Sequence, residues 1–296
     1  MVTMRLVQLL RWSTAISLFL CGLALFIAGA FAGSYAPLPP GCTASACVTG
    51  EYLLAQWPTL MADLVAQNAS GSSTYADQML DAGKSAASYS WSTSAAPTLT
   101  SNADGLTGIN AWSFDGATAN NVKANFSGPN GEQIWPITGD FTLAVVADLS
   151  ASAPTTGTTV YALAGSGLTA ANGWVVGVNQ RKICVKYTGA TSCTITGASA
   201  LSTGTPHLII LSWSSVDQLL AVSIDGGAWQ TASTASVILS GGTLTDATLW
   251  IGNSASSSYA PWWGNVFRAL LLKEALQNSA KAGQLAFLQT ILAAKY

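Results

Sequence analysis

Carboxylates are the first residues to examine for catalysis, because glycoside hydrolysis needs two of them facing one sugar, about 5–9 Å apart. The chain has three glutamates, Glu51, Glu132 and Glu274, and none has an aspartate at a spacing that would place both on one face of a strand. Asp140 and Asp148 bracket an apolar run, but they are too far apart in sequence for one site. The sequence therefore indicates no glycosidase pair.

A serine nucleophile activated by histidine would have to use His207, the only histidine in the chain. That residue lies between Pro206 and an apolar run, a position typical of a strand edge rather than of a general base. The sequence also lacks a G-x-S-x-G motif, a phosphate-binding loop and a Cys/His metal-ligand spacing. We therefore predict that the chain is not an enzyme and needs no cofactor.

Tryptophan is abundant, with 11 in the chain, and offers a second kind of chemistry. Four fall inside expected strands and are predicted to be core: Trp112, Trp174, Trp213 and Trp250. Others lie at turns or strand starts, where an aromatic face can stack on a sugar and nearby polar groups can hydrogen-bond to it. The resulting glycan-binding candidates are Trp229, Asn253, Ser256, Ser258, Tyr259, Trp262 and Trp263. The alternative is that Trp262 and Trp263 only close the end of the fold.

Two cysteine pairs are spaced for local disulfides. Cys184 and Cys193 flank an expected hairpin turn and could join adjacent strands, while Cys42 and Cys47 could close a small loop. The single histidine is distant in sequence from both pairs, which argues against a zinc site. Two local disulfides are typical of an exported protein in an oxidising compartment.

Charged residues are scarce. Asp, Glu, Lys and Arg make up 8% of the chain and the net charge is −2, whereas an average soluble protein has about 25% charged residues. Nucleic-acid binding through phosphate neutralisation needs clustered Lys and Arg and is excluded as a function class. A neutral surface suits a secreted or assembled structural protein, although a GC-rich genome would also favour this composition.

Residues 13–33 are uncharged and apolar, and are long enough to span a bilayer as a helix. Arg5 and Arg11 precede this segment and no basic residue follows until Lys84, so the N-terminus is expected inside and the rest of the chain outside. We favour a retained membrane anchor. The alternative is a signal peptide, since residues 30–32 resemble a cleavage site, and the protein would then be secreted without residues 1–32.

From residue 91 onward, short β-branched and aromatic runs alternate with Gly, Asp and Asn turns, and no helical segments intervene. This pattern predicts a mainly β fold, an antiparallel jelly-roll sandwich over residues 91–276. Residues 34–90 are predicted to be a linker with a short helix that begins near Trp57, where Pro58 would occupy the first turn. Residues 277–296 are predicted to form a C-terminal helix.

Several short motifs follow one another in a characteristic order: Phe114-Asp115-Gly116, Ile224-Asp225-Gly226, Ile251-Gly252-Asn253 and Gly264-Asn265-Val266. In this order they resemble a laminin G-like domain of the concanavalin A-like superfamily. The segment before them, residues 75–116, is similar to that of such domains in bacteriophage virion proteins. The resemblance implies weak Ca²⁺ candidates at Asp115 and Asp225, but turn aspartates need no metal. Asn265 and Arg268 also stand where the family usually carries an acid.

These features together predict a membrane-anchored virion structural or spike protein, whose jelly roll serves assembly or recognition of host-surface glycans. Its expected partners are the membrane, through residues 13–33, other virion or surface proteins in an oligomer, and surface glycans. Nucleic acid is not an expected partner. The alternative function is that of a bacterial cell-surface or secreted carbohydrate-binding adhesin. Both functions rest on the resemblance, because this fold hosts many activities.

Overall fold

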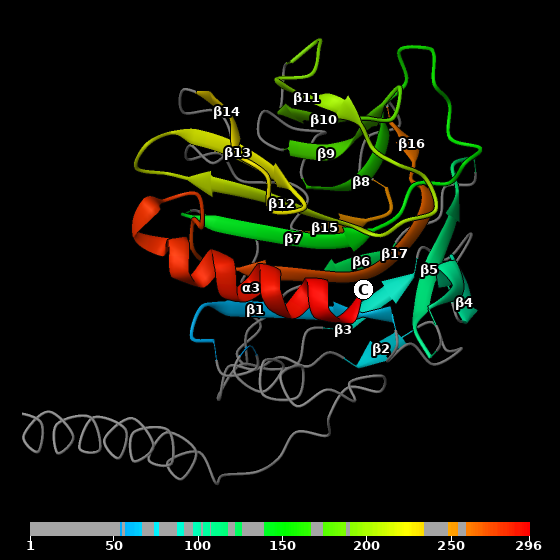
Figure 1. The fold of residues 1–296 in the computed structure, drawn as a ribbon, viewed down its shortest axis with the longest axis horizontal. Coiled ribbons are helices and arrows are strands. Elements are labelled where there is room, and N and C mark those ends of the chain that lie inside the picture. Colours follow the sequence, from blue (N-terminus) through cyan, green and yellow to red (C-terminus); the bar gives the residue numbers. More distant parts are fainter. Residues whose placement is uncertain are drawn as a thin grey trace, which may run out of the picture. The chain divides into compact units, whose positions relative to one another are not determined.

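Two β-sheets that pack face to face make up most of the described chain (Figure 1). The computed structural model describes residues 54, 57–66, 74–76, 88–91, 97–101, 103–106, 108–117, 122–125, 139–166, 174–187, 190–233, 248–253 and 259–296. All of these residues belong to one compact unit. The structure therefore confirms a mainly β protein with antiparallel sheets and a C-terminal helix.

The first sheet has eight strands, and β17 lies near its centre. Its order is β14 (Gln230–Ser233), β13 (Leu219–Ile224), β12 (His207–Ser214), β7 (Phe141–Ala147), β17 (Trp263–Leu272), β5 (Asn110–Asp115) and β4 (Thr98–Ser101). The eighth strand, β1 (Leu60–Val65), also pairs with β17. Because β5 pairs with Trp263–Val266 and β1 with Arg268–Leu272, these two strands lie end to end along one edge of β17.

The second sheet has nine strands. Its order is β11 (Ile195–Ala200), β10 (Lys182–Tyr187), β9 (Trp174–Asn179), β8 (Tyr161–Ser166), β15 (Thr248–Ile251), β6 (Val122–Asn125), β3 (Ser88–Trp91) and β2 (Thr74–Ala76). The two-residue strand β16 (Ala260–Pro261) pairs with β8 in parallel, whereas the other pairings are antiparallel. Cys184 of β10 and Cys193 form the predicted disulfide, with Cα atoms 5.2 Å apart.

The main hydrophobic core lies between the two sheets. Phe141 of the first sheet and Trp174 of the second stack with ring centroids 5.4 Å apart. The core prediction holds for Trp112, Trp174 and Trp213, each at most 3% exposed, while Trp250 is half-buried. Alternate residues of β7 and β12 point into this core, as expected for strands with one face on each layer.

Helix α3 (Ala282–Lys295) covers the outer face of the first sheet and confirms the predicted C-terminal helix (Figure 1). A short 3₁₀ turn, η3 (Ser279–Lys281), precedes it, and another, η2 (Ala103–Gly105), follows β4. Leu288, Ile291 and Leu292 of the helix pack with residues of β12 and β17 in a second apolar cluster. The first sheet is therefore covered on both faces, which explains why its central strands β7, β12 and β17 are mostly apolar on both sides.

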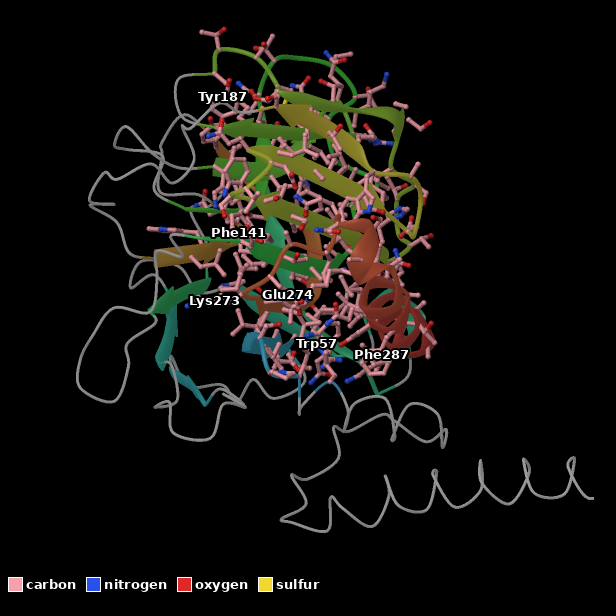
Figure 2. All side chains as sticks on the ribbon, turned by 90° about the vertical axis from the view of Figure 1, so that its left-hand side faces the viewer. Trp57, Phe141, Tyr187, Lys273, Glu274 and Phe287 are labelled. Atoms are coloured by element: carbon pink, nitrogen blue, oxygen red, sulfur yellow. A yellow bond between two sulfur atoms is a disulfide. The ribbon has the colours of Figure 1, made fainter. Side chains whose placement is uncertain are left out.

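The helix predicted from Trp57 is wrong, because Leu60–Val65 forms β1. A strand covered on both faces can carry the same spacing of apolar residues as a helix, so periodicity alone does not separate the two. Tertiary contacts decide for the strand, since it pairs with β17. Just before it, the Trp57 side chain donates to Glu274 at 2.5 Å and packs on Phe287 of α3, and Figure 2 shows the three together.

Strands β1 and β2 precede residue 91 and β3 begins before it, so the sheets extend further toward the N-terminus than the predicted start of the sandwich. Within the described ranges no helix is long and apolar enough to cross a membrane. The predicted spanning segment, residues 13–33, and the predicted Cys42–Cys47 disulfide lie outside the described residues.

Candidate functional site

Aspartates gather at one end of the first sheet. Strands β5, β7 and β13 finish there while β12 and β17 begin there, because neighbouring strands in this sheet run antiparallel. Each finishing strand is followed or ended by an aspartate: Asp115, Asp148 and Asp225 respectively. We call this region the aspartate end.

A cavity of about 400 Å³ opens at the aspartate end. We call it the Asp148 cavity. Its wall includes three carboxylates, an amide, serine hydroxyls and one indole. The polar and aromatic residues that line it are Asp104, Ser113, Phe114, Asp115, Asp148, Ser150, Trp263 and Asn265. None of the described residues that line it is basic.

Asp148 is buried and held by Asn265 of β17. One carboxylate oxygen accepts the backbone N–H of Asn265 and the other accepts its side-chain amide at 3.0 Å. The side-chain oxygen of Asn265 in turn accepts a hydrogen bond from the hydroxyl of Ser113 on β5. Gly264 lets β17 approach this closely, since a Cβ there would lie 2.4 Å from the Asp148 carbonyl oxygen. Neighbouring strands therefore fix the position of the carboxyl group.

The pKa of Asp148 is raised from 3.8 to about 7. Burial is the largest cause, and a hydrogen bond to the Asp104 carboxyl and the negative charge of Asp104 raise it further. The hydrogen bonds from Asn265 act in the opposite direction but are outweighed. The Asp104–Asp148 pair consequently holds a proton close to neutral pH, so it can donate a hydrogen bond as well as accept several.

Trp263 supplies the indole of the cavity wall. The side chain is half-buried, and its ring lies against Gly116, where an added Cβ would come within 2.4 Å of the indole. Its ring centroid is 5.6 Å from that of Tyr161 on β8. The indole is thus braced by the turn after β5 and by the second sheet, while part of its surface faces the cavity.

The other predicted glycan-binding residues do not join Trp263. Trp262 is fully buried and donates to the Asp148 carbonyl oxygen at 2.9 Å, so it has no free face for a sugar. It closes the end of the sandwich, which was the alternative considered for it. Trp229 packs on the cluster beneath α3, and Asn253 is 7% exposed. Tyr259 is half-buried with the Lys186 amine 5.8 Å from its ring centroid.

Ser256 and Ser258 lie outside the described residues. The weak Ca²⁺ candidates are placed in two different cavities, Asp115 in the Asp148 cavity and Asp225 in another next to α3. Asp115 accepts the backbone N–H of Ala117 at 3.0 Å, as an aspartate in a turn commonly does. In the part of the chain that the structure describes, no three His, Cys, Asp or Glu side chains form a group that could hold a metal.

Sequence reasoning missed Asp104, and it considered Asp148 only as a partner of Asp140. Asp104 precedes a glycine and adopts a left-handed conformation with φ 54°, which an Asp-Gly pair hints at. Nothing in the sequence indicates that this turn folds back onto the end of β7. That meeting depends on the sheet order, which places β5 beside β17 and β4 beside β5.

Comparison with known proteins shows similarity of structure only. No protein-family model matches the chain, and no curated protein matches it in sequence. Among solved structures, Trypanosoma rangeli sialidase in complex with sialic acid is similar with a TM-score of 0.54 and 13% identity, over 79% of this chain and 33% of that one. The binding domain of botulinum neurotoxin DC in complex with rat synaptotagmin II has a TM-score of 0.52 and 10% identity, over 78% and 51%.

At these identities the likeness shows the fold, and this chain spans about a third of the sialidase and half of the toxin domain. It supports the predicted β-sandwich fold and leaves the laminin G and bacteriophage parts of the resemblance without support. It also corrects one prediction. The expectation that the chain is not an enzyme is overturned, because several of the similar structures are those of a sialidase, which is an enzyme.

Proposed function

We propose that this sandwich recognises a neutral glycan in the Asp148 cavity. The observation that carries the proposal is the composition of one cavity wall, where the Asp104–Asp148 pair, the Asn265 amide and the Trp263 indole all line the same space. A sugar presents hydroxyl groups that both donate and accept, and C–H faces that pack on aromatic rings. The cavity offers acceptors, donors and an aromatic surface for these groups.

The charge of the cavity selects among sugars. Asp104 and Asp115 face it together with Asp148, and none of the described lining residues is basic. An acidic sugar would bring a further carboxylate against these groups, and like charges close together in a partly desolvated site repel. A neutral sugar avoids this cost. The preferred ligand therefore differs in charge from the sialic acid bound by the similar sialidase.

The proposal includes display on the outer side of a membrane. This part rests on the sequence, through the apolar segment 13–33 and the basic residues that precede it. A binding role also agrees with the similar structures, since the sialidase is in complex with sialic acid and the toxin binding domain is in complex with rat synaptotagmin II. The carrier is a cell surface or a particle enclosed by a membrane.

The test is glycan binding by the purified protein, screened on an array of neutral oligosaccharides and their sialylated counterparts and then measured by calorimetry. We expect a neutral glycan to bind and its sialylated form to bind more weakly. Replacing Trp263 by Ala should weaken binding about tenfold, because a lost aromatic contact is worth about 1.4 kcal/mol. Trp263→Phe should retain most of the affinity.

Trp229→Ala is the matched control, since Trp229 is also half-buried but packs on the cluster beneath α3. It should leave the affinity unchanged. Thermal melting of each variant shows whether the fold is intact. Failure of every neutral glycan to bind, or tighter binding of the sialylated forms, would show that the proposal is wrong.

A further inference from the structure

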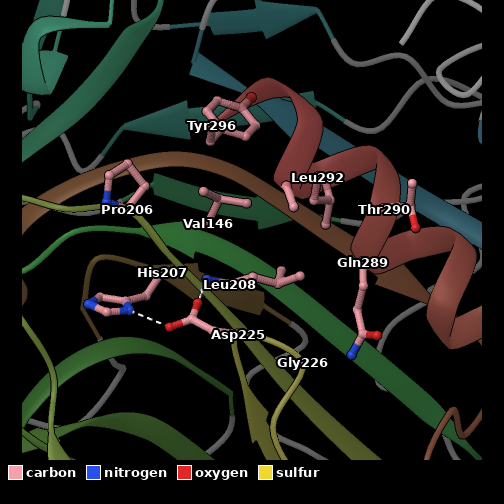
Figure 3. A pocket seen from close by; sticks show the side chains of 11 residues that line it. Val146, Pro206, His207, Leu208, Asp225, Gly226, Gln289, Thr290, Leu292 and Tyr296 are labelled. Carbon is pink, nitrogen blue, oxygen red and sulfur yellow. Dashed lines mark hydrogen bonds and ion pairs between the residues drawn. The ribbon is translucent and has the colours of Figure 1, made fainter. Parts of the chain in front are cut away.

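A second reactive group lies at the aspartate end, outside the Asp148 cavity. The Ser202 hydroxyl oxygen is 2.8 Å from Nε2 of His207, and Nδ1 of His207 is 2.6 Å from Oδ2 of Asp225. Oδ1 of Asp225 accepts the backbone N–H of Leu208 at 2.8 Å. Figure 3 shows the imidazole with one nitrogen toward Asp225 and the other on the far side of the ring. Serine, histidine and aspartate thus form one hydrogen-bonded chain.

Backbone hydrogen bonds position the three hydrogen-bonded side chains. His207 begins β12 and Asp225 follows β13, and these strands pair antiparallel with Ile209 opposite Ile224. The backbone N–H of Asp225 also donates to the Leu208 carbonyl at 2.9 Å. The segment that carries Ser202 is bound on one side, where the N–H of Leu201 donates to the Arg181 carbonyl at 2.9 Å. Strand pairing therefore fixes the positions of His207 and Asp225, and the hydrogen bond of Leu201 anchors the residue next to Ser202.

Burial differs among the three side chains. Ser202 is exposed, so a substrate can reach its hydroxyl. His207 is 9% exposed and lines the cavity beside α3, while the Asp225 side chain is 50% exposed. A base that is shielded and oriented beside a reachable hydroxyl is the arrangement that activates serine in hydrolases.

The pKa shifts of His207 and Asp225 also agree with a histidine that acts as a base. The hydrogen bond to Asp225 raises the pKa of His207 above 6.5, against the lowering by burial. Burial raises the pKa of Asp225, but the hydrogen bonds from His207 and Leu208 together lower it below its usual value. Asp225 is therefore ionised at neutral pH and holds a proton on Nδ1. In neutral His207, Nε2 is then free to accept the serine proton.

We propose that Ser202, His207 and Asp225 form a catalytic site that hydrolyses small carboxylic esters, with Ser202 as nucleophile and His207 as base. Ser202 Oγ attacks the ester carbonyl carbon while its proton passes to His207 Nε2. The bond to the alcohol oxygen then breaks, and that oxygen takes the proton from His207. Water next attacks the acyl carbon and gives a proton to His207, and Ser202 Oγ leaves with this proton. The products are an alcohol and a carboxylic acid.

The position of the site suggests which alcohol forms the ester substrate. Gly204, two residues after Ser202, lines the Asp148 cavity, and its backbone N–H donates to the Leu149 carbonyl at 2.9 Å. A sugar in that cavity would lie beside the loop that carries the nucleophile. The substrate class is therefore a sugar hydroxyl esterified with a short acyl group. This choice of alcohol rests on the proposed function, whereas reactivity toward a simple ester does not.

The experiment uses the full chain, a fluorophosphonate probe and p-nitrophenyl acetate. We expect the probe to label Ser202 in a 1:1 ratio, identified by peptide mass, and a burst of p-nitrophenol. Ser202→Ala should abolish both. Asp225→Asn, which disturbs the orientation of His207, should slow hydrolysis by about 10³–10⁴-fold. Ser215 is the matched control, because its hydroxyl bonds the Asp140 carboxylate at 2.7 Å without a histidine, and it should stay unlabelled.

A purely structural role for His207 makes the opposite prediction. His207 Nε2 is also 3.3 Å from the Ser202 carbonyl oxygen, so a charged imidazole could simply tie the loop to β12. In that case the folded wild type would remain unlabelled at Ser202 and hydrolyse the ester no faster than Ser202→Ala, and the proposal would be overturned. Labelling without glycan binding would retain the catalytic site and reject the proposed function, and binding without labelling would do the reverse.

Discussion

Asp148 shows how a single side chain can gain unusual chemistry from its surroundings. Its carboxyl is buried beside a second carboxyl, and only the amide groups of Asn265 favour its charged form. The charged form is therefore disfavoured, and the proton stays on the pair up to about pH 7. At a surface turn the same residue would be ionised well below neutral pH.

The pH dependence of the unfolding free energy should show whether Asp148 is protonated. The unfolded chain releases the Asp148 proton near pH 3.8, while the folded chain keeps it to about pH 7. The contribution of Asp148 to the free energy of unfolding is therefore fully present below pH 3.8 and is lost as the pH rises toward 7. Asp148→Asn cannot titrate, so its stability should fall less over this range than that of the wild type. Urea denaturation at several pH values measures the difference.

Asp104→Asn is the companion variant. Asp104 has φ 54°, a conformation that asparagine accepts readily, so the turn should persist. Without the neighbouring charge the pKa of Asp148 should fall, and the pH dependence should weaken in the same direction as in Asp148→Asn. Stability curves that run parallel for all three proteins would contradict the proton-sharing pair.

At the scale of elements, a buried ion pair links β1 to β17 in addition to the backbone pairing of the two strands. The guanidinium of Arg268 binds the Asp63 carboxylate through two hydrogen bonds, of 2.8 and 2.5 Å, and both side chains are buried. Buried charges are costly when unpaired, so the pair favours the register in which Asp63 meets Arg268. Glu274 adds a second link, since it bonds Trp57 and lies 2.9 Å from the Lys281 amine.

Removal of one partner should be far more damaging than removal of both. Asp63→Ala leaves Arg268 buried without its carboxylate, and we expect a loss of about 3–5 kcal/mol in unfolding free energy. The double variant Asp63→Leu, Arg268→Met replaces the pair with apolar groups of similar size and should recover most of this loss. Chemical denaturation compares the three proteins. A change below about 1 kcal/mol in Asp63→Ala would mean that the pair does not hold β1.

At the scale of the whole molecule, the described fold has three layers rather than the two of a simple sandwich. The second sheet and the first enclose the main core, and α3 with Trp57 covers the far side of the first (Figure 2). Because that far side carries apolar residues such as Ile210, Phe267 and Leu270, the first sheet needs this cover. The helix is therefore part of the fold and not an appendage.

Deletion of residues 278–296 should expose this face. Leu288, Ile291 and Leu292 are each at most 4% exposed, and burial of such a side chain contributes about 1.5–3 kcal/mol. We expect the shortened chain to lose roughly 5 kcal/mol or more, and to bind a hydrophobic dye. Ala294→Ser, on the exposed side of α3, is the control and should change stability by less than about 0.5 kcal/mol. Unchanged stability after the deletion would contradict the three-layer description.

Several features could be predicted from the sequence because they depend on neighbours along the chain. Strand periodicity and turn residues identified the antiparallel β class, and the spacing of Cys184 and Cys193 around a turn identified their disulfide. The C-terminal helix could also be predicted from the local pattern of apolar residues. Local patterns also predicted a helix over β1, and there they failed, because its partner strand lies about 200 residues later in the chain.

The candidate sites were decided by tertiary structure. Asp104 meets Asp148 only through the order of strands in the first sheet, and His207 meets Asp225 only because β12 and β13 pair in one register. No local signal marks either contact, since turn aspartates and a strand-edge histidine are common in any β protein. The sequence by itself determined which elements form, while the sheet order and register determined which side chains share a cavity and a proton. Side chains distant in sequence can meet only once the strands have paired, and their burial and pKa follow from that pairing.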